Sequence, residues 1–193
     1  MGILNSRSSN FIFNFPKDWF YPEIQEKWTP YYKKQPLPYE TAADFINVTV
    51  QSISFPGFNM EEVSQQKKGG KRIDFKSAKN VNDLYGNEVT INFAHVDGFF
   101  NYWMLQDNIN LFLNFDQTDL YLPDFTIRIL DNEGFIMTSI FMKEILFKSF
   151  SELELSYTNN SFDFKSFSVT FSYNNLEIKL EAAEKSIQLG RVF

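Results

Sequence analysis

The sequence predicts a mainly β fold, an antiparallel β-sandwich or barrel with one flanking α-helix and extended arms. The first observation is the stretch 140–178, where three alternating apolar and polar runs are separated by short polar breaks. A period of two is typical of strands that bury one face. In the last run the apolar face extends from Phe167 to Tyr173, and the residues between are Ser and Thr. The second observation is that only 97–113 has a clear helical period.

Turn sequences delimit the predicted strands. Pro56-Gly57 and Asp131-Asn132-Glu133-Gly134 are typical of turns, and Asn159-Asn160 joins the last two runs. Between these breaks the apolar runs predict strands at 10–15, 44–55, 87–94, 125–130, 135–147, 151–157 and 161–173.

The helix predicted at 97–113 reads DGFFNYWMLQDNINLFL, with Asp97 in the position of an N-cap. Its large apolar residues form one broad face, through which we expect it to pack on the sheet: Phe99, Phe100, Trp103, Met104 and Leu111. Helix formers between 177 and 190, closed by a glycine, also fit a terminal helix.

Residues 16–39 form a proline-rich, aromatic arm between the first two predicted strands. Five prolines exclude a long regular helix, because proline lacks a backbone donor and has a fixed φ. Pro22 fits the start of a short helix that Pro30 would end. Since the chain has phenylalanine enough for its own core, we expect the rings of this arm to contact another subunit: Trp19, Phe20, Tyr21, Trp28, Tyr31 and Tyr32.

Residues 61–80 are polar and contain two adjacent glycines, which predicts a long hairpin with no core of its own. The glycine pair lacks the strand, Gly-Lys-Ser/Thr sequence and helix of a phosphate-binding loop. The basic tip is either a simple exposed loop or an electrostatic docking element for an acidic neighbouring surface. Its residues are Lys67, Lys68, Gly69, Gly70, Lys71 and Arg72.

Composition limits the kinds of partner. The 193 residues are 44% hydrophobic and include 23 Phe, more than one small core needs. A net charge of −6 argues against tight binding of nucleic acid, although it suits a surface past which DNA slides. No apolar run reaches the ~20 residues of a membrane helix, so no membrane partner is expected. The absence of cysteine excludes disulfides and thiolate chemistry.

No group of residues indicates catalysis. His95 is the only histidine and has no candidate catalytic partner in the sequence. The acidic pairs Glu61-Glu62 and Asp116 with Asp119 are explained by solvated loops, because their spacing does not bring them to one cleft. We therefore expect no catalytic residue, no metal ligand, no cofactor and no enzymatic activity.

The order of these features resembles that of the tail tube proteins of contractile-tailed phages, and of the tube-like baseplate and hub proteins with the same fold. A strand ending in Phe-Pro-Gly is followed by a Gly-Gly hairpin, a strand, the helix DGFFNYWMLQD and the terminal run SELELSYTNNSFDFKSFSVTFSY. The resemblance spans about 45–173, together with 10–15. It implies a β-sandwich or barrel flanked by one helix, sixfold rings stacked around a channel, no cofactor and no catalysis.

From this resemblance we expect a virion structural protein, a single tail-tube-like domain over 1–193 that assembles in the host cytoplasm. Its rings would be stacked and hexameric, and DNA would pass through their lumen during ejection without specific binding. The hairpin 61–80 would dock on an adjacent ring. Further partners would be sheath, baseplate, hub or terminator proteins.

Two segments depart from the pattern of a simple tube subunit and leave other roles open. The inserted arm 16–39 and the C-terminal extension 177–193 also suit a hub, baseplate or terminator ring of the same fold. A β-sandwich module that binds a receptor or glycan is a further alternative, and it would be a monomer or small oligomer with an exposed aromatic platform.

Overall fold

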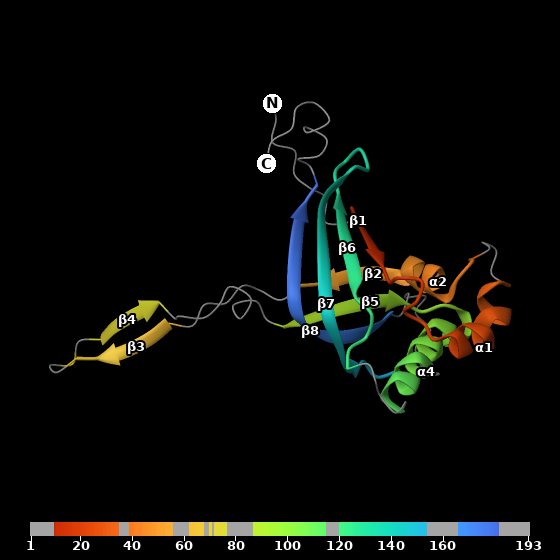
Figure 1. The fold of residues 1–193 in the computed structure, drawn as a ribbon, viewed down its shortest axis with the longest axis horizontal. Coiled ribbons are helices and arrows are strands. Elements are labelled where there is room, and N and C mark those ends of the chain that lie inside the picture. The colour runs from red at the N-terminus through yellow and green to blue at the C-terminus, as the bar shows by residue number, and fades with distance from the viewer. Residues whose placement is uncertain are drawn as a thin grey trace, which may run out of the picture.

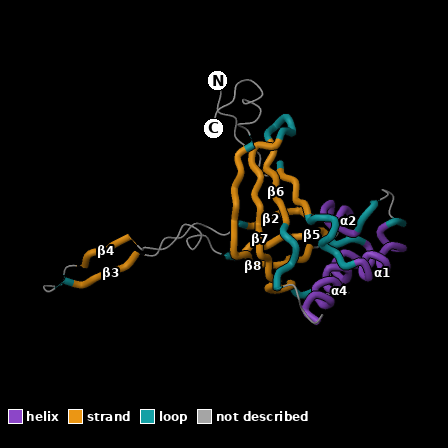
Figure 2. The backbone as a smooth tube through the Cα atoms, viewed as in Figure 1, coloured by secondary structure: helices purple, strands orange, loops and turns teal. Residues whose placement is uncertain are grey.

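The computed structural model describes residues 10–34, 39–55, 62–67, 70, 72–76, 87–114, 120–153 and 166–181. Within these ranges the chain is mainly antiparallel β, with three α-helices and a 3-10 turn (Figure 1, Figure 2). The elements are β1 (Phe11–Asn14), α1 (Pro22–Tyr32), α2 (Ala42–Thr49), β2 (Val50–Ser54), β3 (Glu62–Gln66), β4 (Arg72–Lys76), β5 (Glu88–Ala94), η1 (Asp97–Phe99), α4 (Phe100–Asn114), β6 (Phe125–Leu130), β7 (Ile136–Phe150) and β8 (Ser166–Leu180).

Six strands form one antiparallel sheet in the order β1-β6-β7-β8-β5-β2. The sheet curls into a nearly closed, barrel-like form, because β2 and β5 cross the upright strands β1, β6 and β7 at a steep angle (Figure 1). The predicted antiparallel barrel is confirmed. The expectation of one flanking helix is wrong, since α1, α2 and α4 gather together on one side of the sheet (Figure 2).

Alternate residues of the central strands face the core, as the sequence predicts. On β8 the apolar residues from Phe167 to Tyr173 are buried, and β5 buries Val89, Ile91 and Phe93 opposite them. The Ser and Thr residues between them on β8 are exposed or half-buried. This alternation defines which face of the sheet is the inside of the barrel.

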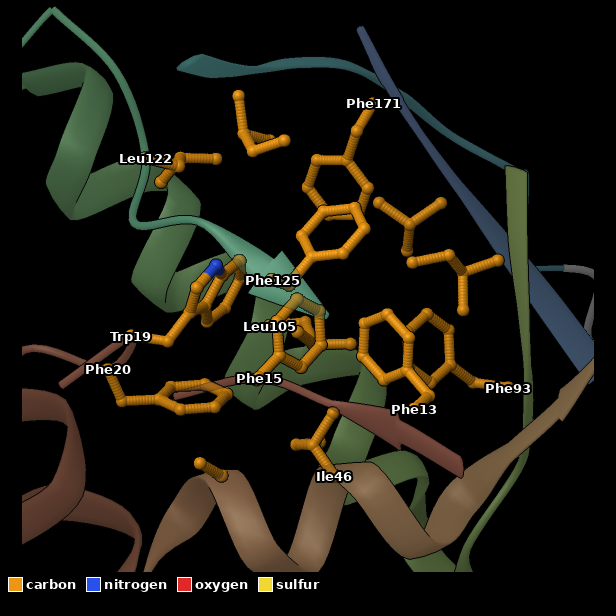
Figure 3. Packing of buried hydrophobic residues seen from close by; sticks show 14 of the residues in the cluster. Phe13, Phe15, Trp19, Phe20, Ile46, Phe93, Leu105, Leu122, Phe125 and Phe171 are labelled. Atoms are coloured by element: carbon orange, nitrogen blue, oxygen red, sulfur yellow. The ribbon is translucent and has the colours of Figure 1, made fainter. Parts of the chain in front are cut away.

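Aromatic rings fill the centre of the core (Figure 3). The ring centroid of Phe15 lies 4.2 Å from that of Trp19 and 4.6 Å from that of Phe13, which it meets edge-on. Phe125 and Phe171 pack beside them with centroids 5.7 Å apart. Such offset and edge-on contacts are the favourable geometries for aromatic pairs.

Part of the aromatic arm belongs to this core, which corrects the expectation that its rings need another subunit to cover them. Trp19 and Phe20 are each 1% exposed, and Tyr32 is also buried. Asn108 on α4 holds the segment in place, because its side chain accepts from the Tyr21 N–H at 3.0 Å and donates to the Trp19 carbonyl at 3.0 Å. The arm therefore covers the helical side of the barrel in its own chain.

Helix α1 starts at Pro22 as predicted, but it continues through Pro30 instead of ending there. Pro30 is exposed. Beyond it the Lys33 N–H still donates to the Thr29 carbonyl at 3.2 Å, which completes the last turn.

The strand predicted at 44–55 is wrong in its first half, which forms α2. A capping box starts this helix: the Asp44 N–H donates to the Thr41 hydroxyl at 3.1 Å, and the Thr41 N–H donates to the Asp44 carboxylate at 3.2 Å. The buried residues of α2 also follow a helical period, whereas only β2 is extended.

Helix α4 forms as predicted but buries a different face. Trp103 is 42% exposed, and Phe99 and Phe100 are only half-buried. Two asparagines lie on the buried face and interrupt its apolar period; the side chain of Asn101 donates to the Ala94 carbonyl at 2.6 Å. The buried positions are Asn101, Met104, Leu105, Asn108, Ile109 and Phe112.

The start of this helical segment also differs from the prediction. Asp97 is the first residue of η1 and is not its N-cap. Val96 occupies the N-cap position, and no side chain caps the turn. Gly98 has φ of 73°, a left-handed conformation that glycine adopts readily, and it redirects the chain before α4 begins.

The C-terminal predictions are corrected where they can be compared. Strand β8 continues to Leu180, so residues 177–180 are extended and not helical. Residues 182–193 lie outside the described residues, as do 154–157 of the strand predicted at 151–157. Residues 151–153 lie outside any strand.

Replacing Trp19 with alanine should lower the free energy of unfolding by about 3–5 kcal/mol, because it removes a fully buried ring from the aromatic cluster. Urea unfolding followed by the fluorescence of the remaining tryptophans measures this. Tyr31→Ala is the matched control, since Tyr31 is 45% exposed and should cost about 1 kcal/mol or less. Equal losses in the two variants would contradict the placement of Trp19.

Candidate functional site

The surfaces that could join this chain to others are the edges of its sheet. Among the described strands, β1 and β2 end the strand order, and each pairs with one neighbour. Strand β8 pairs with β5 only between Ser166 and Ser172, whereas it pairs with β7 as far as Leu180. The Tyr173 N–H still donates to the Asn87 carbonyl at 2.9 Å, and beyond it the side of β8 away from β7 has no described strand alongside it. An edge strand offers its backbone groups to any extended partner.

The backbone of β1 directs alternate residues toward its open side. The Leu130 N–H donates to the Asn10 carbonyl at 2.9 Å, so Asn10 and every second residue after it face β6. In an antiparallel pair the residues between them point the other way. The backbone N–H and C=O groups of Phe11, Phe13 and Phe15 thus face the seam where the barrel stays open.

Asn47 of α2 closes one end of this seam. Its side-chain oxygen accepts from the Phe15 N–H at 2.8 Å, and its amide nitrogen donates to the Phe15 carbonyl at 3.3 Å. The amide thereby occupies the place of a neighbouring strand at this one residue. Beside Phe11 and Phe13, a groove of about 370 Å³ remains between β1 and the junction of α2 with β2.

Two side-chain contacts accompany the backbone ladder that joins the outer part of β8 to β7. Lys143 donates to Glu177 at 2.7 Å, and the Ser139 hydroxyl donates to Glu181 at 2.6 Å. The carboxylate raises the pKa of Lys143, and the ammonium group lowers the pKa of Glu177, because each bond favours the charged forms. Both residues of the ion pair are exposed enough for solvent to screen it, so it orients the ribbon more than it stabilises it.

Strands β3 and β4 form the predicted hairpin as a separate two-stranded sheet, and Figure 1 shows it well apart from the barrel. Asp74 lies opposite Ser64, whose hydroxyl donates to its carboxylate at 2.7 Å, and Arg72 Nε donates to it at 2.8 Å. At the tip the Gly70 N–H donates to the Lys67 carbonyl at 3.1 Å, with Gly70 at φ of 79°. Lys68, Gly69 and Lys71 lie outside the described residues.

Of the remaining rings of the predicted arm, only Tyr31 is exposed, whereas Trp28 and Tyr21 are half-buried against the core. Trp28 and Tyr31 on α1 have centroids 5.2 Å apart, and Tyr31 lies 4.9 Å from Phe100 on α4. Asp107 ties the two helices together, because it accepts from the Trp28 indole at 2.9 Å and from Lys27 at 2.6 Å. These three rings of the arm remain candidates for contact with a neighbour, unlike Trp19, Phe20 and Tyr32, which are buried.

Nothing in the described part of the chain forms a chemical centre. Among these residues no cluster of His, Asp or Glu could hold a metal ion. The His95 ring packs between aromatic rings, with its centroid 4.8 Å from Phe99 and 5.2 Å from Phe167. In the described ranges, no helix has the length and apolar character needed to span a membrane.

Comparison with known proteins identifies the fold. No family model and no curated protein matches the chain. It is similar to a chain of the anti-feeding prophage cap, the tube terminating cap, with 11% identity, 93% of this chain and 94% of that chain covered, and a TM-score of 0.53. A chain of the anti-feeding prophage baseplate shares 13% identity, with 91% of this chain and 96% of that chain covered and a TM-score of 0.54.

A third similar structure is the sheath–tube complex of an extracellular contractile injection system in its extended state. One of its chains shares 12% identity over 92% of this chain and 93% of that chain, with a TM-score of 0.54. The chain therefore has the fold of tube, cap and baseplate proteins of contractile injection systems. The resemblance to phage tail tube proteins, noted from the order of sequence features, is confirmed at the level of the fold.

Replacing Asn47 with alanine should lower the free energy of unfolding by about 1–3 kcal/mol, because the buried Phe15 backbone loses its partners. Chemical denaturation measures the loss. Asn14→Ala is the matched control, since Asn14 is exposed and only accepts a long bond of 3.4 Å from Asn47. A loss no larger than that of the control would show that Asn47 does not seal the seam.

The carboxyl group of Asp74 should titrate below its ordinary pKa of 3.8, chiefly because of the Ser64 hydroxyl and then because of Arg72. A lowered pKa in the folded state means that these bonds support the hairpin above the ordinary pKa. They are lost as the pH falls through the lower value. NMR titration of the Asp74 carboxyl carbon measures this, and Ser64→Ala should raise the midpoint. An unchanged midpoint in Ser64→Ala, with Gln65→Ala as control, would contradict the assignment.

Proposed function

We propose that this chain is a structural subunit of a phage-type tail, a tail tube or tube-like protein that forms stacked hexameric rings around a channel. DNA would pass through this channel during ejection. The observation that carries the proposal is the barrel-like sheet with open edges, in the fold of tube, cap and baseplate proteins of contractile injection systems. We also propose that residues 1–193 act as one domain.

Ring closure follows from the strand edges. A contact between two different edges of the same subunit is heterologous, and repetition around an axis closes such contacts into a ring. Closure would pair the edges that a single copy leaves exposed. The acidic balance of the chain, with a net charge of −6, would keep DNA from adhering to the lumen.

A position at the end of a tube is the second candidate. The terminating cap covers 93% of this chain at a TM-score of 0.53, so the fold fits a cap or baseplate ring as well as a tube. Sheath, baseplate, hub or terminator proteins would be the partners in the assembled tail. In all these roles the chain would be a structural protein of the virion tail, assembled in the host cytoplasm, and not an enzyme.

Electron micrographs of the purified chain should show sixfold rings, with tubes at high concentration if it is a tube subunit and rings alone if it is a cap. Size-exclusion chromatography with light scattering gives the number of subunits. A stable monomer at all concentrations would contradict the proposal and would favour the receptor- or glycan-binding module instead.

Deleting residues 65–72 should abolish stacking and leave single rings, because the hairpin has a sheet of its own and the barrel does not depend on it. Micrographs score the length of stacks, and circular dichroism checks that the barrel is intact. Lys67→Ala with Arg72→Ala in the full-length hairpin tests whether the charge of the tip matters. Stacks of normal length after the deletion would show that the hairpin does not join rings.

A further inference from the structure

The apolar rows of the barrel interior continue to both open edges of the sheet. Residues directly opposite each other on neighbouring strands share a face. One such row runs from Phe13 on β1 through Ile127 and Ile140 to Ile178 on β8. The next row along the strands consists of Phe11, Ile129, Thr138 and Leu180, and is apolar except at Thr138.

The β8 end of these rows is uncovered. Ile140 and Ile127 are buried, but Ile178 is 51% exposed and Leu180 is 68% exposed. They face the same side as the buried core, so their exposure marks a surface that the described residues leave uncovered. Paired apolar side chains on an open edge favour the addition of another strand.

The β1 end of the same rows borders the groove described above. Its walls come from Phe11 and Phe13 on one side and from Val48 and Val50 on the other. Val48 is 65% exposed. Asn47 and Gln51 also line the groove, which at about 370 Å³ is large enough for branched aliphatic side chains. Its apolar wall residues match the apolar side chains at the β8 end.

We infer that Ile178 and Leu180 of β8 fill the groove beside β1 of a second copy of this chain. The inference rests on the proposed self-assembly and names the contact that would hold neighbouring subunits together. Strands β8 and β1 run in opposite directions within the sheet, so one copy placed beside the next brings them together as an antiparallel pair. The rows of the two cores then become continuous across the interface.

Cysteine cross-linking tests this contact, because the natural chain contains no cysteine. In the double variant Val48→Cys with Ile178→Cys, a short bis-maleimide should give a ladder of covalent multimers on a denaturing gel. Phe11→Cys with Ile178→Cys is the second pair. The control is Val48→Cys with Lys179→Cys, since the residue next to Ile178 points to the opposite face, and we expect at least tenfold less product from it.

A point substitution gives an independent measurement. Ile178→Asp should reduce ring yield at least tenfold while the melting temperature of the monomer stays unchanged, because the side chain is half exposed. Met137→Asp, on β7 and away from the open edge, should assemble normally. Wild-type rings without a ladder from either pair, or with equal ladders in the control, would overturn this inference alone. A wild-type chain that forms no rings would overturn it together with the proposed function.

Discussion

The backbone hydrogen bonds of the sheet constrain this molecule more than any side-chain contact. In a fully closed barrel every strand pairs on both sides. Here β1 and β2 are edge strands, and β8 extends beyond the end of its pairing with β5. The chain satisfies one backbone position with the Asn47 amide, at Phe15. The remaining positions along β1 require either solvent or another strand.

The aromatic arm and the helices cover the apolar side of the strongly curled sheet. Trp19 and Phe20 pack under the barrel, and Asn108 fixes the segment that carries them. The inserted arm is thus part of the fold as well as a source of surface rings. Within the described residues, the strands β3 and β4 pair with each other in a sheet separate from the barrel.

Strand alternation made much of the fold predictable from the sequence. The buried face of β8 and the strands β1, β5 and β6 follow directly from a period of two, which needs no tertiary information. The errors occur where the apolar residues alone do not define one period or one face. Helix α2 has apolar residues that fit either period, and only the cap between Thr41 and Asp44 distinguishes them. In α4 the buried Asn101 and Asn108 interrupt the apolar pattern, because their partners are backbone groups outside the helix, near Asn101 in the sequence but far from Asn108.

The candidate assembly surfaces were predictable only in part. The glycine pair and the polar flanks indicated the hairpin, whereas Trp19 and Phe20 could not be told from surface rings without knowing where the arm folds. The seam beside β1 carries no sequence signal of its own, since it arises from strand order and curl. The only indication of an assembly surface in the sequence there is the pair Ile178 and Leu180, which are apolar residues at alternate positions in a polar segment.

Backbone amide exchange at Phe11 and Phe13 tests the central claim most directly, because these N–H groups point to the open side of β1. Residue-resolved hydrogen exchange compares the monomer with the assembled form. The account predicts fast exchange at both residues in the monomer and strong protection after assembly, together with protection along β8 from Asn174 to Leu180. Assembled rings in which the Phe11 and Phe13 amides exchange as fast as in the monomer would contradict it.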